Sequence, residues 1–340
     1  MRNRLNEARA LVPAVAAQLF QGAPGIRSVG VGLVGQDYGF VVEERADTAR
    51  PLCAQAAPRA TTPPAELFGF PVRRQLAYRA PAPLPWHRNS LQGLALQRQP
   101  EQARVRPLVG GLEVQNLDAD QRAGVLSHGG YVGTLGCLVR LADGSPGMLS
   151  NAHVLADCGR GQCGHDRIMQ AGGCRFYSAP EHVAVLEASL PLVAEPPGVA
   201  HFGGLTLNTG DAAVARLLPG MAHIPGYLPM RGVPAPVGTA TPVPGDVVFK
   251  VGRTTGLTRG VVDRVGLVDS VPYPHGLCWF EEVFSVRADG DDEFADDGDS
   301  GSAVLRSDGT VLGLLFASAS NGVLCCEIEA LLGGLGCVLM

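Results

Sequence analysis

The chain lacks long apolar runs and basic runs, and each absence narrows the classes of protein it can belong to. In its 340 residues no stretch approaches the roughly 18 consecutive apolar residues that a membrane-spanning helix needs. The 27 Lys and Arg residues are outnumbered by 32 Asp and Glu, and no cluster of basic residues stands out. Because such a chain has no positive field to attract phosphate backbones, we expect neither a membrane nor a nucleic acid as partner.

A convincing secretory signal and an even set of cysteines are also missing. The first nine residues include Glu7, and the apolar stretch after them is short and broken by Pro13 and Gln18. Nine cysteines cannot all pair within one chain, and such a count favours reduced thiols. We therefore predict a soluble, cytoplasmic protein.

Glycine and proline, by contrast, are abundant. The 45 glycines and 26 prolines follow no fixed period, while 46% of the residues are apolar. Because Gly and Pro interrupt elements and form turns, this composition favours many short strands over long helices. We predict a mostly β protein, long enough for one large domain and a small one.

The pattern of apolar residues divides the chain into three parts. Helical spacing predicts a helix from Leu5 to Phe20, and two strands follow at 26–33 and 38–43, so residues 1–80 form a small α/β module. Residues 81–115 are rich in proline and are expected to be a linker or a surface strap. Residues 116–340 contain short strand-like runs typical of barrels or sandwiches, at 131–140, 145–150, 212–217, 246–251, 260–268, 279–287, 302–306 and 310–316.

The strongest local signal is the string G-D-S-G-S from Gly298 to Ser302. Glycines on both sides of Ser300 allow a tight turn in which the hydroxyl stands out and backbone N–H groups converge. The amides of Gly298 and Ser300 are therefore candidates for an oxyanion hole. Taken alone, such a string is as often a simple turn.

A serine hydroxyl needs a base to become a nucleophile, and His153 has the most suggestive setting among eight histidines. It follows the strand-like run 147–152 and precedes a short apolar stretch, a position that projects an imidazole into a cleft. The second imidazole nitrogen needs an acceptor, which Asp211 can supply at the start of the run 211–217. Residues without such a context are expected on the surface or in loops: His165, His182, His201, His223 and Asp166.

These segments resemble the three motif blocks of chymotrypsin-like serine proteases. The strings L-S-N-A-H at 149–153, G-D-A-A-V at 210–214 and G-D-S-G at 298–301 occur in that family's order of His, Asp and Ser. G-T-L-G at 133–136 and G-R-T-T-G at 252–256 support the comparison. Together with the preceding module, they are similar to the intracellular trypsin-like proteins of bacteria and plants. The resemblance implies two antiparallel six-stranded β-barrels with the active site between them.

The resemblance further implies a serine endopeptidase with a catalytic triad. Ser300 would attack the peptide carbonyl, His153 would take its proton, and Asp211 would stabilise the imidazolium. It implies no metal and no cofactor. The expected partner is a protein or peptide substrate, with a regulatory protein as a further candidate.

Substrate preference cannot be carried over from trypsin-like relatives. The chain has no cleavable Ile-Val-Gly-Gly activation site and no obvious cysteine pairs across the barrels. Phe294 stands six residues before the nucleophile, where enzymes that cut after Lys or Arg carry an aspartate. We assign Phe294 to substrate binding together with Asp297, Phe316, Ala317 and Ser318. This set favours apolar residues in the primary pocket and basic residues outside it.

Several alternatives stay open. Cys158, Cys163, His165 and Cys174 resemble a zinc cluster with irregular spacing, and free thiols or a local disulfide are the other interpretations. The acidic run 289–297 is a solvated loop, an attractor of basic substrate segments or a calcium site. The rival functions are a non-catalytic scaffold that binds a partner, and a hydrolase restricted to self-cleavage or to esters.

Overall fold

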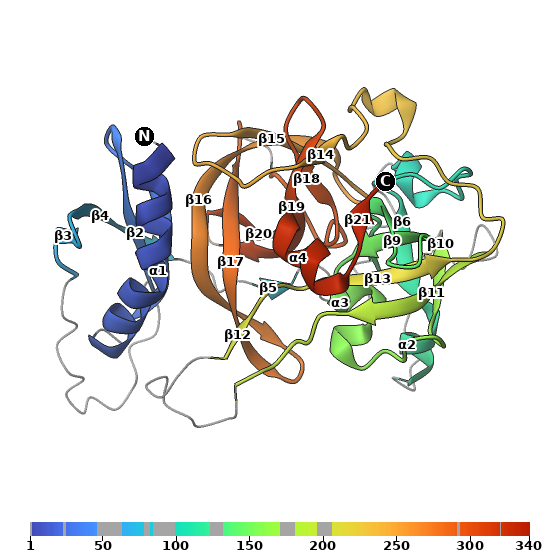
Figure 1. The fold of residues 1–340 in the computed structure, drawn as a ribbon, viewed down its shortest axis with the longest axis horizontal. Helices are drawn as coiled ribbons and strands as arrows, with labels where there is room; N and C mark the ends of the chain where they lie inside the picture. The colour runs from blue at the N-terminus through green and yellow to red at the C-terminus, as the bar shows by residue number, and fades with distance from the viewer. Residues whose placement is uncertain are drawn as a thin grey trace.

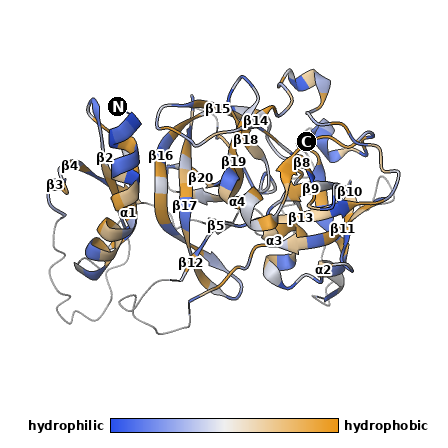
Figure 2. Cartoon of the chain, in the orientation of Figure 1, coloured by the Kyte–Doolittle hydropathy of each residue, from blue (hydrophilic) through white to orange (hydrophobic). Residues whose placement is uncertain are grey.

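The computed structural model describes residues 2–22, 25–45, 63–77, 82–83, 99–122, 132–170, 181–195, 206–290, 293–319 and 321–340. Two β-barrels lie side by side, and the N-terminal helix lies at the end of the molecule remote from the first barrel (Figure 1). Figure 2 shows that apolar residues are concentrated in the barrel strands. The fold is therefore mostly β, as predicted.

The first barrel is closed by one bent segment. Its antiparallel strands pair in the order β8-β9-β13-β11-β10-β6-β7, and only Leu135 and Gly136 separate β7 from β8, so the sheet curls until its two ends meet. A side chain at Gly136 would lie 2.4 Å from the carbonyl oxygen of Gly301 in the second barrel, so the close contact of the barrels requires glycine there. The strands are β6 (Glu113–Asn116), β7 (Val132–Thr134), β8 (Cys137–Arg140), β9 (Pro146–Ser150), β10 (Arg167–Gln170), β11 (Glu181–Ser189) and β13 (Ala213–Leu217), with β21 (Val338–Leu339) paired to β8.

The second barrel is closed by strand pairing alone. Its six strands form the antiparallel ring β15-β16-β17-β20-β19-β18, and β18 pairs back onto β15. They are β15 (Val247–Gly252), β16 (Gly256–Tyr273), β17 (Gly276–Ala288), β18 (Ala303–Leu305), β19 (Thr310–Ala319) and β20 (Gly322–Glu327). Three short strands pair with its members: β5 (Ala82–Pro83), β12 (Leu207–Asn208) and β14 (Gly238–Thr239).

The N-terminal module extends the sheet of the second barrel. β1 (Ile26–Val34) pairs antiparallel with β16, and β2 (Asp37–Arg45), β4 (Phe70–Ala77) and β3 (Glu66–Leu67) continue outward. Helix α1 (Arg2–Gly22) packs across these strands, with the rings of Phe20 and Trp279 5.2 Å apart. Arg9 of α1 forms an ion pair with Glu327 at 2.8 Å. The module is therefore hydrogen-bonded and ion-paired to the second barrel.

Most predicted strands coincide with observed ones, and the predicted helix lies within α1. β6 begins inside the stretch predicted as a linker, which also contains β5, and residues 81 and 84–98 of that stretch lie outside the described residues. No strand was predicted at β4, β6, β10, β11 or β20, nor at the two-residue strands β3, β5, β12, β14 and β21. Three helices were also not predicted: α2 (Leu117–Arg122), α3 (Ala152–Leu155) and α4 (Ile328–Leu335). In the described part of the chain no helix is both long and apolar enough to cross a membrane.

Candidate active site

The loop that carries Ser300 is held against the first barrel. Thr134 of β7 donates its N–H to the carbonyl oxygen of Ser300 at 2.7 Å and its hydroxyl to that of Gly298 at 3.0 Å. Gly298 has a φ of +97°, and a Cβ there would lie 2.7 Å from Arg253 and from Thr254. The tight turn predicted for G-D-S-G-S is therefore present, and its first glycine is required both by conformation and by space.

Asp299, the residue before Ser300, anchors the same loop from the second barrel. The Asp299 carboxylate accepts from the N–H of Thr254 at 2.8 Å, and from the N–H and hydroxyl of Thr255 at 3.2 and 2.6 Å. Nζ of Lys250 lies 3.1 Å from Asp299 Oδ2, and neither side chain is exposed. Burial lowers the pKa of Lys250, and the charge of Asp299 offsets only part of that effect. The G-R-T-T-G hairpin thus positions the loop of Ser300 through Asp299.

His153 and Asp211 form a buried pair in the first barrel. His153 lies in α3, directly after β9, and Asp211 precedes β13. The N–H of His153 donates to Asp211 Oδ1 at 3.0 Å, and Nδ1 of the ring contacts Oδ2. Asn151 donates to the carbonyl oxygen of Asp211 at 2.6 Å. Burial acts to raise the pKa of Asp211, but the charge of His153 and its hydrogen bonds outweigh burial and lower the pKa.

The other ring nitrogen of His153 is available for chemistry. Nε2 is buried and has no hydrogen-bond partner among the described residues. Ser300 lies close to α3, because a Cβ at Gly133 would lie within 3 Å of both Val154 and the carbonyl oxygen of Ser300. The structure therefore brings the three predicted triad residues to the junction of the barrels.

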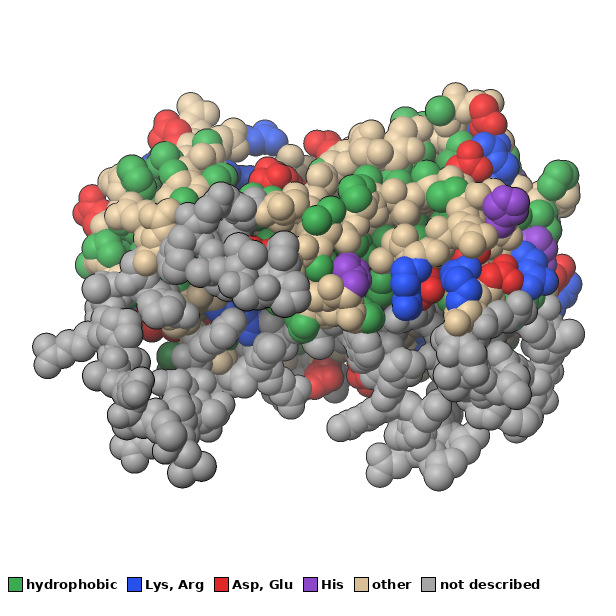
Figure 3. Space-filling model, turned by 90° about the horizontal axis from the view of Figure 1, so that it is seen from below, with side chains coloured by type: hydrophobic (Ala, Val, Ile, Leu, Met, Phe, Trp, Pro, Cys, Tyr) green, Lys and Arg blue, Asp and Glu red, His purple; other side chains and the backbone are tan. Residues whose placement is uncertain are grey.

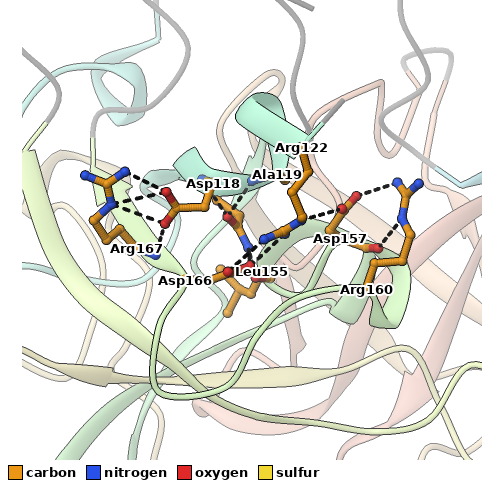
Figure 4. A network of polar contacts seen from close by, with 9 residues as sticks. Asp118, Ala119, Arg122, Leu155, Asp157, Arg160, Asp166 and Arg167 are labelled. Carbon is orange, nitrogen blue, oxygen red and sulfur yellow. Dashed lines mark hydrogen bonds and ion pairs between the residues drawn. The ribbon is translucent and has the colours of Figure 1, made fainter. Parts of the chain in front are cut away.

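A polar network holds the chain just after α3 (Figure 4). Asn116 donates to the carbonyl oxygen of Leu155 at 2.6 Å and to Asp166 at 2.8 Å, and Arg122 binds both carboxylate oxygens of Asp166. Arg122 also approaches Asp157, which has an unusual positive φ of +49°. Such a backbone conformation persists only where neighbouring groups fix it. Asp166 is thus a buried structural residue, although it lies in a loop as expected.

Among the described residues, the other histidines have local roles or face solvent. His182 and His223 contact the carbonyl oxygens of Ala184 and Met221. His165 is exposed and lines an open hollow of about 410 Å³ beside the polar network. On the face seen in Figure 3, acidic and basic side chains alternate at the end that carries the first barrel. His201 lies outside the described residues.

The residues assigned to substrate binding do not form one cluster. Phe294 is only 2% exposed and belongs to the hydrophobic cluster that includes α1, and the Phe316 ring packs 5.0 Å from that of Phe280. The backbone of Ala317 and Ser318 forms an antiparallel pair with β5. Asp297 is exposed, and its carbonyl oxygen accepts from the hydroxyl of Thr254. Their roles in binding stay predictions.

The cysteine and acidic clusters are described only in part. No disulfide links the described cysteines, and Cys53 and Cys174 lie outside the described residues. Within the described ranges no group of three His, Cys, Asp or Glu side chains could hold a metal ion. In the acidic run, Asp289 pairs with Arg259 at 3.1 Å, while positions 291 and 292 are not described.

Among the residues that contact the triad segments, Tyr273, Lys250 and Cys326 were not predicted. Tyr273 donates to Asp211, and Lys250 pairs with Asp299. Neither has a local signal, because each lies in an ordinary strand and becomes notable only through a partner far along the chain. The nearby G-R-T-T-G string was the only hint of the Lys250 contact.

The two barrels have the chymotrypsin-like fold expected from the sequence. His153 and Asp211 lie on the first barrel, and Ser300 lies just before a strand of the second.

No family model and no curated protein matches the chain. Among solved structures, Thermobifida fusca protease A is 19% identical over 68% of this chain and 97% of its own, with a TM-score of 0.44. An alpha-lytic protease homologue, N4, is 21% identical over 68% and 99%, with a TM-score of 0.43. The Rv3671c protease of M. tuberculosis is 19% identical over 66% and 79%, with a TM-score of 0.38.

Proposed function

We propose that this protein is a serine endopeptidase that hydrolyses peptide bonds through an acyl-enzyme. The observation that supports it most is the buried contact of His153 with Asp211, which leaves Nε2 without a partner beside the loop of Ser300. In this proposal Nε2 takes the hydroxyl proton as Ser300 attacks, and Asp211 stabilises the imidazolium. His153 then protonates the leaving amine, and water releases the acyl group.

The amides of Gly298 and Ser300 are assigned to the oxyanion. Asp299 lies between Gly298 and Ser300 and is held by Lys250 and Thr255. In this proposal these contacts fix the orientation of the two amides before substrate arrives. Preorganised donors of this kind cost no reorganisation when charge develops on the substrate oxygen.

The substrate backbone is assigned to the edge of β19 at Ala317–Ser318. The N–H of Gly301, next to the nucleophile, donates to the carbonyl oxygen of Leu315 at 2.8 Å, so a strand added further along this edge lies beside Ser300. Extended peptides bind readily to such edges. Because β5 already pairs there, a substrate has to displace it. The cytoplasmic location inferred from the cysteine count belongs to this proposal.

A fluorophosphonate probe tests the proposal directly. The probe is expected to label the wild type at Ser300 and to leave Ser300→Ala unlabelled, while both forms stay folded. Incubation with a denatured protein mixture should then yield new N-termini only with the wild type. Labelling without cleavage of proteins would favour the self-cleaving or ester-restricted hydrolase, and no labelling would favour the non-catalytic scaffold.

A further inference from the structure

Asp211 accepts a hydrogen bond that the motif blocks do not account for. The hydroxyl of Tyr273 donates to Oδ2 of Asp211 at 2.5 Å, on the oxygen that also contacts Nδ1 of His153. His153 and Asp211 belong to the first barrel, but Tyr273 is the last residue of β16 in the second. This bond therefore joins the two barrels at the catalytic carboxylate.

The position of the Tyr273 hydroxyl is fixed by packing on several sides. The side chain is buried, with its ring centre 6.0 Å from Phe280 and 6.3 Å from His153. The turn after it places His275 5.9 Å away, and His275 is in turn within 3.0 Å of the carbonyl oxygen of Leu192. A ring held in this way keeps its donor directed at Asp211.

Tyr273 stays a donor over the whole working range of pH. Burial raises its pKa well above the usual value, and the negative charge of Asp211 raises it further. The thiols of Cys278 and Cys326 also face Asp211, and burial raises the pKa of each, so they stay uncharged near neutral pH. Cys158 lies near Tyr273 as well.

We propose that Tyr273 is a positioning residue of the catalytic site, which orients Asp211 and sets how strongly its charge holds a proton on His153. This inference rests on the proposed function. A donor on Oδ2 spreads the carboxylate charge, and removing it concentrates that charge on the side facing the imidazole. His153 then keeps its proton to higher pH, and the carboxylate loses one of its fixed contacts.

Tyr273→Phe removes the hydroxyl and keeps the ring. The matched control is Tyr227→Phe, which alters another buried tyrosine of the same hydrophobic cluster. We expect Tyr273→Phe to lower kcat about 10- to 100-fold, the range for losing one hydrogen bond to a charged group, with little change in KM. The acid limb of the pH–rate profile should move up by about half to one pH unit. The control should change neither quantity.

A nuclear magnetic resonance titration of the His153 ring supplies a readout that needs no turnover. Its protonation midpoint should move up in Tyr273→Phe. It should move down when 3-fluorotyrosine, a stronger hydrogen-bond donor, replaces Tyr273. The 3-fluorotyrosine variant also tests the inference if Tyr273→Phe does not fold. If the wild type is inactive but the protonation midpoint of His153 still shifts in the two Tyr273 variants, the proposed function is refuted. The effect of Tyr273 on Asp211 and His153 is then still supported. A midpoint that neither variant moves would overturn the inference, even if kcat falls, because a purely structural role accounts for that loss.

Discussion

Breaking the buried ion pair of Lys250 with Asp299, the residue before Ser300, should destabilise the protein strongly. Removing one partner of such a pair costs about 3–5 kcal/mol, because the other charge stays buried without compensation. In Lys250→Met that charge is Asp299, which keeps the donors of Thr254, Thr255 and Asp296. These bonds place the expected loss at the lower end, about 3 kcal/mol. The free energy of unfolding should fall by this amount.

Urea unfolding followed by tryptophan fluorescence measures this loss in the free energy of unfolding. If the slope of that free energy against urea concentration is unchanged, the folded state is as compact as before. The matched control is Arg306→Met, which breaks a partly exposed ion pair with Asp246 and should cost less than about 1 kcal/mol. The double variant Lys250→Met, Asp299→Asn should lose less than the sum of the single variants, because no unpaired charge remains. If Lys250→Met were as mild as the control, Asp299 would not depend on Lys250 for its charge balance.

Further variants test other parts of the site. Asp211→Asn should lower kcat on the order of 10⁴-fold, and a near-normal rate with an inactive Asp166→Asn would show that the wrong aspartate was chosen. Burial raises the pKa of Asp269 to about 7, so the folded state binds this proton more tightly than the unfolded chain does. The free energy of unfolding should fall as pH rises from about 4 to about 7, by up to about 1.4 kcal/mol per pH unit, and urea titrations of Asp269→Asn should show a flatter decline. Replacing Ala82–Pro83 by two glycines should raise kcat/KM for peptides several-fold by weakening the strand pair on β19, and an unchanged value would place the substrate elsewhere. If Phe294 lies at the pocket base, a peptide library should show cleavage after apolar residues, whereas dominant cleavage after Lys or Arg at high salt would exclude that position.

The features that sequence predicted well are those with a local cause. The turn at Gly298 depends on its own conformation and on neighbouring atoms, and the His153 and Asp211 segments stand at the ends of short strands whose pattern is visible in the sequence. Order along the chain then identified which histidine and aspartate belong with Ser300. The structure shows the contact of His153 with Asp211, while the Nε2–hydroxyl bond and the catalytic roles of the three residues stay predictions.

What could not be predicted depends on pairing between distant segments. Tyr273 meets Asp211, and Lys250 meets Asp299, only after both barrels have closed, so no local period marks either pair. The module was predicted as a separate unit because its helix and strands form a complete local pattern. Its pairing to β16 depends on backbone hydrogen bonds, which any sequence with strand geometry can make, and so leaves no mark in the sequence.

The pairing of β1 with β16 also determines when the chain can finish folding during its synthesis. Val29 pairs with Val268, so one edge of β1 has no native partner until the chain as far as β16 has left the ribosome. Contacts so distant along the chain form slowly, and an open strand edge in the meantime can pair with other chains. A nascent chain that stalls before β16 would present that edge of β1 unpaired, so the sheet around β1 is completed only after the whole first barrel has been made.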